Sequence, residues 1–125
     1  MNKMREFSLP RNNLSGKIPS DMFKSWPQLT LFYLHYNSFT GRIPLEIGEA
    51  KMLQRLSLFS NNLSLARFQK KSEAWQACRV PTEIGNLRAL QDLELNNNQL
   101  EGELSATLTL LKELNDLSLS INKFT

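Results

Sequence analysis

Few residues of this 125-residue chain could carry catalytic chemistry. His35 and Cys78 are its one histidine and one cysteine, and they lie far apart, so they offer neither a metal-ligand cluster nor a cysteine–histidine nucleophile. The chain has no glycine-rich phosphate loop and no protein-kinase signature. We therefore expect no enzyme activity, no metal and no cofactor.

Aromatic and acidic side chains point instead to recognition. Tyr33, His35, Tyr36 and Phe59 fall on neighbouring segments, and exposed aromatic side chains are enriched at binding hot spots. An acidic strip follows them in the chain, formed by Asp92, Glu94 and Asp116, and two basic residues precede them, Arg5 and Arg11. We predict a peptide or protein contact surface here. The alternative is cross-strand packing that only stabilises a sheet, and the sequence does not decide between the two.

The elements that would position these residues form a repeat. The pattern L-x-x-N-x-(L/F) occurs five times, centred on Asn12, Asn37, Asn61, Asn98 and Asn122. Three of the four intervals are 24 or 25 residues long, which is the length of a leucine-rich repeat, and the interval from Asn61 to Asn98 is 37.

Each of these asparagines follows an apolar-x-apolar pair, such as Leu56 and Leu58. That alternation predicts a short strand with one buried and one exposed face. Further apolar residues, such as Ile43 and Ile47, could be buried only if neighbouring repeats stack. We therefore predict an α/β leucine-rich-repeat solenoid over residues 1–125, with short parallel strands on the concave face and loops or 3₁₀ turns on the convex face.

The recurring asparagines predict an internal hydrogen-bond ladder. An asparagine side chain offers both donors and an acceptor, so it can satisfy the backbone groups of a turn that faces the interior. Asparagines exposed in turns are the alternative, which the regular spacing disfavours.

The segment after each asparagine resembles the L-x-G-x-I-P signature of plant-specific leucine-rich repeats. It is present from Leu14 to Pro19 and from Phe39 to Pro44, whereas the fourth repeat has Ser105 in place of the proline. The chain is thus similar to ectodomains of plant receptor-like kinases and receptor-like proteins.

That resemblance implies a module outside the plasma membrane that binds a peptide or protein, often with a co-receptor, in signal perception. A secreted inhibitor of the polygalacturonase-inhibitor type and a non-functional truncated product are the alternatives. The family's cysteine-paired caps, signal peptide, membrane span and kinase domain have no counterpart in these residues. We therefore expect a fragment of a longer protein, attached to the membrane only through its other parts.

An atypical insertion of about 15 residues spans 65–79. It could be a functional insert, a tolerated loop or short helix, or retained intron sequence, and the clean return of the motif at Val80 favours the last two. The insertion carries four basic residues and one acid, which equals the whole net charge of +3. The repeats themselves are neutral, so nucleic acid is not an expected partner.

Asn13 and Asn62 begin N-x-S sequons and are candidate glycosylation sites if the chain enters the secretory pathway. Mass spectrometry of the plant-expressed parent would exclude this if both asparagines were unmodified.

Overall fold

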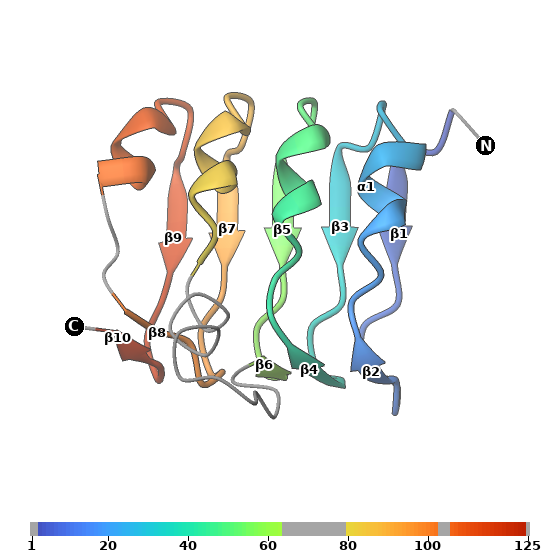
Figure 1. Ribbon diagram of the computed structural model, residues 1–125, viewed down its shortest axis with the longest axis vertical. Coiled ribbons are helices and arrows are strands. Elements are labelled where there is room, and N and C mark those ends of the chain that lie inside the picture. Colours follow the sequence, from blue (N-terminus) through green and yellow to red (C-terminus); the bar gives the residue numbers. More distant parts are fainter. Residues whose placement is uncertain (1–2, 64–79, 103–105, 125) are drawn as a thin grey trace.

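The computed structural model describes residues 3–63, 80–102 and 106–124. The predicted insertion at 65–79, with Cys78, lies outside the described residues. Figure 1 shows successive coils stacked side by side. Each coil contributes one strand to a five-stranded parallel sheet in the order β1-β3-β5-β7-β9. These strands are β1 (Glu6–Ser8), β3 (Leu31–Tyr33), β5 (Arg55–Ser57), β7 (Asp92–Glu94) and β9 (Asp116–Ser118). The predicted leucine-rich-repeat solenoid is confirmed.

The register of this main sheet follows the leucine pattern. The central residues of the five strands are paired in one continuous row, formed by Phe7, Phe32, Leu56, Leu93 and Leu117. Alternate side chains of a strand point to opposite faces, so this row faces the interior of the coil and its neighbours face outward. We call the outward surface of the main sheet the sheet face.

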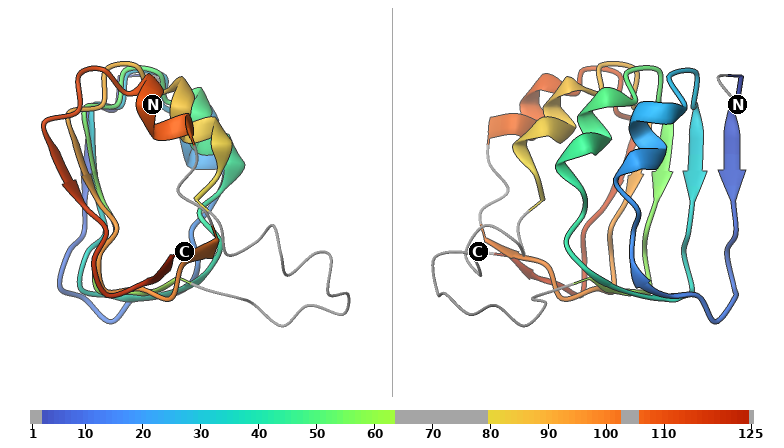
Figure 2. Two further views of the ribbon diagram at one scale, coloured as in Figure 1. Left: turned by 90° about the vertical axis from the view of Figure 1, so that its left-hand side faces the viewer. Right: turned by 45° about the vertical axis from the view of Figure 1, so that its right-hand side comes forward.

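Short helices line the opposite side of the coil, as Figure 2 shows. They are α1 (Asp21–Ser25), η1 (Leu45–Glu49), η2 (Thr82–Asn86) and η3 (Ala106–Leu110), and the last three are 3₁₀-helices. Pro44 and Pro81 precede η1 and η2 in extended conformation. In the first repeat, buried Phe23 follows Pro19 by one residue more than buried Ile47 follows Pro44 in the second. The first repeat accordingly forms an α-helical turn in place of a 3₁₀-helix.

A second set of strands, which the sequence did not predict, follows the main sheet in each coil. β2 (Ser15–Lys17), β4 (Ser38–Gly41) and β6 (Asn62–Leu63) form one parallel sheet, and β8 (Glu101–Gly102) pairs with β10 (Lys123–Phe124). These strands have two to four residues, and two of them contain a glycine with positive φ, Gly16 at 86° and Gly41 at 78°. Such short segments carry no readable alternation.

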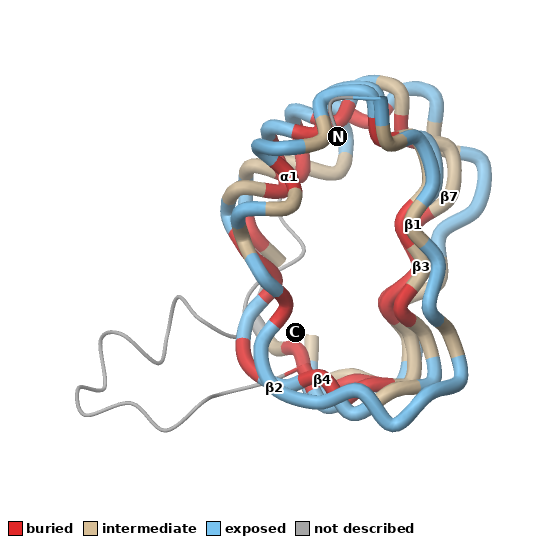
Figure 3. The backbone as a smooth tube through the Cα atoms, turned by 90° about the vertical axis from the view of Figure 1, so that its right-hand side faces the viewer, coloured by how far each residue is buried: buried red, intermediate tan, exposed pale blue. Residues whose placement is uncertain are grey.

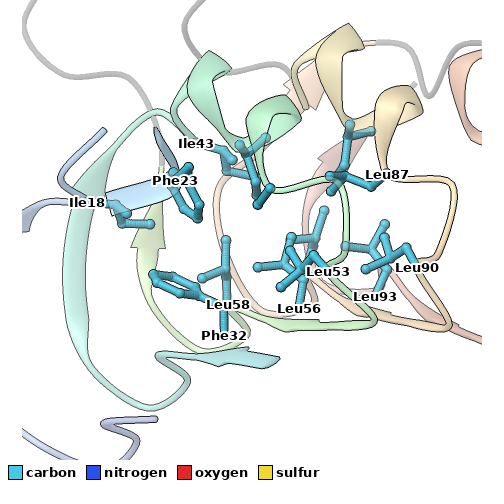
Figure 4. Close-up of a cluster of buried hydrophobic side chains, with 14 of the residues drawn as sticks. Ile18, Phe23, Phe32, Ile43, Leu53, Leu56, Leu58, Leu87, Leu90 and Leu93 are labelled. Carbon is cyan, nitrogen blue, oxygen red and sulfur yellow. The ribbon is translucent and has the colours of Figure 1, made fainter. Parts of the chain in front are cut away.

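The core fills the space between the main sheet and the helices. Figure 3 shows the buried positions on the inward side of the coil, and Figure 4 shows their side chains stacked from one repeat to the next. Ile47, Leu53, Leu56 and Leu93 are fully buried. The outermost repeats have a neighbour on one side only, so Leu117 is 46% exposed where its equivalent Leu93 is 0% exposed. Within the described residues, no helix is long and apolar enough to cross a membrane.

Candidate ligand-binding face

The strand register arranges the outward residues of the sheet face in rows. One row pairs Tyr33, Ser57 and Glu94 across β3, β5 and β7. A parallel row pairs Arg55, Asp92 and Asp116 across β5, β7 and β9. The predicted site residues therefore share one surface, with the aromatic residues over β3 and β5 and the acids over β7 and β9.

Four ring-bearing residues are linked through ring contacts that centre on His35, and we call them the aromatic cluster: Tyr33, His35, Tyr36 and Phe59. The His35 and Phe59 rings stack with centroids 4.6 Å apart and an interplanar angle of 6°. Tyr36 meets Phe59 edge-on at 5.1 Å, and Tyr33 meets His35 edge-on at 5.6 Å. Stacked and edge-to-face pairs at these distances are favourable arrangements for aromatic rings.

Arg11 belongs to this cluster, although the sequence placed it among residues at the far end of the surface. Its guanidinium carbon lies 4.4 Å from the centroid of the Tyr36 ring. A cation over a tyrosine face is attracted by the ring's negative quadrupole. The contact arises because Arg11 and Tyr36 hold the same position in successive repeats, each immediately before a ladder asparagine.

The underside of the cluster is polar. The alternation of β5 places Ser57 on the sheet face, yet it is only 1% exposed. Its Oγ lies 3.2 Å from Nδ1 of His35. Burial lowers the pKa of His35, and the positive charge of Arg11 lowers it further. His35 is consequently held as a neutral, stacked ring near neutral pH.

The acidic side of the sheet face holds three carboxylates and one guanidinium. Nε of Arg55 lies 3.2 Å from Oδ2 of Asp92, an ion pair that the sequence did not suggest. The pKa of Asp92 is nevertheless raised, first by burial and then by the hydrogen bond and charge of Asp116, with Arg55 opposing. The pKa of Glu94 is raised by burial and by the charges of Asp92 and Asp116. Arg55 thus leaves the negative charge of this group incompletely balanced.

The ladder asparagines lie at the end of the main strands and link successive repeats. Asn61 shows the pattern, since its Nδ2 donates to the Leu58 carbonyl of its own repeat at 3.1 Å and to the Leu34 carbonyl of the preceding repeat at 3.0 Å. Its Oδ1 accepts from the backbone N–H of Phe39 at 3.0 Å. Equivalent bonds are made by Asn37, Asn98 and Asn122. Asn12 is exposed, and its side chain donates only within its own repeat, to the carbonyls of Leu9 and Pro10.

Each ladder asparagine follows a residue in left-handed conformation, which sequence reasoning missed. These residues have φ between 53° and 57°, and they are Arg11, Tyr36, Ser60, Asn97 and Ile121. They share no side-chain chemistry, so only their fixed position before the asparagine marks them. At Tyr36 this conformation places an aromatic side chain, 43% exposed, at the edge of the aromatic cluster.

Asn13 and Asn62, the two sequon asparagines, are both exposed, and they lie at or beside the strands of the second sheet rather than on the sheet face. Across the described ranges, no group of three or more histidine, cysteine, aspartate or glutamate residues is arranged to hold a metal ion.

Comparisons with known proteins agree with this architecture. A family model described as Leucine Rich Repeat matches residues 28–50. No curated protein matches the chain significantly. Among solved structures, a chain of the BIR3–SERK2 complex from Arabidopsis thaliana shares 28% identity at a TM-score of 0.79, with 94% of this chain and 56% of that chain covered.

Two further structures are similar over most of the chain. The structure of the Arabidopsis receptor kinase HAESA with the peptide hormone IDA and the co-receptor SERK1 shares 26% identity at a TM-score of 0.73, covering 91% of this chain and 20% of that one. A leucine-rich-repeat protein of Leptospira interrogans shares 30% identity at a TM-score of 0.71, covering 97% and 26%.

The chain therefore spans 56% of the BIR3–SERK2 chain and 20% of the chain in the HAESA structure. Its repeats, their register and these similarities lead to one conclusion: the chain is a leucine-rich-repeat solenoid, and its fold is similar to that of the ectodomains of plant receptor kinases.

Proposed function

We propose that this chain is a recognition module that binds a peptide or protein ligand on its sheet face, as part of signal perception at the outer side of the plasma membrane. The observation that carries the proposal is the aromatic cluster. Its rings lie on the solvent-facing side of the sheet, and the core is formed by other residues. Exposed and mutually supported aromatic side chains are the residues that most often dominate binding energy at interfaces.

The similar structures support this choice of partner. HAESA was solved with a peptide hormone and a co-receptor, and BIR3 was solved in a complex with SERK2. We extend that kind of partner, a peptide or a second ectodomain, to this chain. The main sheet is rigid because each strand pairs on its backbone with the next, and a rigid platform limits the conformational entropy lost on binding.

The competing explanation is that the rings only stabilise the sheet by packing across strands. The stacked pair of His35 and Phe59 fits either explanation. Tyr36 favours recognition, because 43% of it remains exposed even though it contacts Phe59, His35 and Arg11. A ring that served packing alone would gain more from burial.

The test uses a substitution that removes the ring and preserves the backbone. Asparagine adopts the left-handed conformation more readily than most residues, so Tyr36→Asn should keep the turn intact. Ile121→Asn is the matched control, because Ile121 holds the same left-handed position in the last repeat, is 72% exposed and is not among the contacts of the aromatic cluster.

A random linear peptide library would be selected on the immobilised wild-type chain, and enriched peptides would be measured by calorimetry against both variants. We expect Tyr36→Asn to weaken binding by roughly tenfold or more, as for a residue at the centre of an interface, and Ile121→Asn to leave it unchanged. The proposal fails if no peptide is enriched, or if the two variants bind enriched peptides equally well.

A further inference from the structure

The sheet face is strongly polarised along the stack of repeats. At one end Arg11 lies over Tyr36 and adds a positive charge to the aromatic cluster. At the other end β7 and β9 present Asp92, Glu94 and Asp116. A ligand that crosses the strands would pass from a cationic, aromatic region to an anionic one.

The anionic end has more negative charge than its own residues balance. Asp92 and Asp116 are direct partners in the register, although like charges directly opposite each other on a sheet are destabilising. In the described part of this face, the ion pair to these acids is that of Arg55 with Asp92. Burial and the neighbouring acidic charges raise the pKa of both Asp92 and Glu94, in line with this shortage of positive partners.

An independent observation concerns a neutral group at the same end. Asn96 follows Glu94 by two residues, and its side-chain Oδ1 is buried with no hydrogen-bond partner among the described residues. Buried acceptors are almost always satisfied in folded proteins, so an unsatisfied one calls for an explanation. It adds a buried, unsatisfied acceptor to the segment that carries Asp92 and Glu94, although as a buried atom it is not itself a ligand contact.

We propose that the ligand is an extended basic peptide, whose apolar or aromatic residue packs on the aromatic cluster and whose arginine or lysine side chain is bound by Asp92, Glu94 and Asp116. This inference rests on the function proposed above and specifies its ligand class. Guanidinium and ammonium groups supply several donors and a positive charge, which the anionic end lacks. Arg11 repels a cation at the opposite end, so it sets the orientation of the peptide.

The strand spacing predicts how far apart the two peptide residues lie. Neighbouring strands are about 4.8 Å apart, so the centre of the β3–β5 region and the centre of the β7–β9 region are separated by about 10 Å. An extended peptide advances about 3.3 Å per residue. The basic residue should therefore lie about three residues from the apolar one, and the peptide should run across the strands rather than beside an edge.

The experiment uses the peptides enriched from the random library and a charge-neutralised variant of the chain. Glu94→Gln with Asp116→Asn removes two negative charges from the sheet face and leaves the Arg55–Asp92 pair in place. The matched control is Glu46→Gln with Glu49→Gln, which removes the same charge from η1 on the other side of the coil. Each peptide would also be synthesised with glutamine in place of its basic residue.

We expect the enriched peptides to share a basic residue at the predicted spacing. Neutralising Glu94 and Asp116 should weaken their binding about tenfold at low salt, since two partly exposed charge contacts are lost, and the control should not. The glutamine peptide should bind wild type and the neutralised variant equally, because it no longer contacts the acids. Raising the salt concentration should weaken the basic peptide more than the glutamine peptide.

The outcomes separate this inference from the proposed function. Enriched peptides that depend on Tyr36 but carry no basic residue, or that bind the neutralised variant as well as wild type, overturn the inference and leave the recognition module standing. A library that yields no binder overturns the recognition module itself, and the basic-peptide inference with it.

Discussion

The asparagine ladder predicts a large loss of stability at one interior position. Asn61 is 8% exposed and lies in the third of the five repeats. Replacing it with alanine removes the donated hydrogen bonds to the carbonyls of Leu34 and Leu58, a longer one to the Phe59 carbonyl at 3.4 Å, and the bond accepted from the N–H of Phe39.

The size of this loss in stability depends on which hydrogen bonds each backbone group keeps after the substitution. The Leu34 carbonyl still accepts from Asn37 at 3.0 Å, and the Leu58 carbonyl still accepts from Asn98 at 3.0 Å, so each loses a second bond worth about 1 kcal/mol. The Phe39 N–H loses its acceptor in a buried setting, which costs about 1–3 kcal/mol. We expect Asn61→Ala to lower the free energy of unfolding by about 3–5 kcal/mol in total.

Urea unfolding followed by circular dichroism measures this loss, and Asn12→Ala is its control. Asn12 is exposed and its side chain donates only to carbonyls of its own repeat, so removing that side chain should cost less than about 1 kcal/mol. Equal losses for the two variants would refute the ladder as a source of stability, because burial and the links to neighbouring repeats are what distinguish them.

Two further predictions test the backbone. Ile121 is β-branched, 72% exposed and held at φ 53°, so Ile121→Asn should raise the free energy of unfolding by about 1 kcal/mol. An unchanged midpoint of urea unfolding would show that the turn is not strained. Gly85→Ala should lower it by about 1–3 kcal/mol, because the new Cβ would lie 2.7 Å from Cγ2 of Thr107 in the next repeat. A Cβ added at Gly16 would have no atom within 4 Å, but the residue has φ +86°, so Gly16→Ala should cost about 1 kcal/mol from backbone conformation alone. Equal losses at the two glycines would argue against close packing of η2 and η3.

Much of the fold was predictable because the repeat sets its own register. Leucine pairs before each ladder asparagine predict both the main strands and their buried faces, and a constant repeat length makes equivalent residues neighbours. The second sheet was not predictable. Its strands are too short for an alternation to show, and Gly16 and Gly41 are typical of turns rather than strands.

The candidate site was predictable in its membership but not in its contacts. Alternation alone places Tyr33, His35 and Phe59 on one face, and the register makes them neighbours. The ion pair of Arg55 with Asp92 and the position of Arg11 over Tyr36 depend on side-chain rotamers, which no sequence pattern specifies. Ser57 is 1% exposed although strand alternation places it outward, since alternation gives the side that a residue faces and not how far its neighbours cover it.

The second set of strands is divided between β6 and β8, whereas the main sheet is continuous from β1 to β9. Across the same junction β5 pairs with β7, η1 packs on η2, and Asn98 accepts from the N–H of Leu63 at 3.1 Å. These three contacts therefore hold the two repeats together at this junction, and pairing of β6 with β8 is not required. For protein engineering, the stretch that joins Leu63 to Val80 is a suitable site for replacement by another segment. A loop, tag or small domain could be exchanged there, because the pairing of β5 with β7 holds the register of the sheet face across this junction.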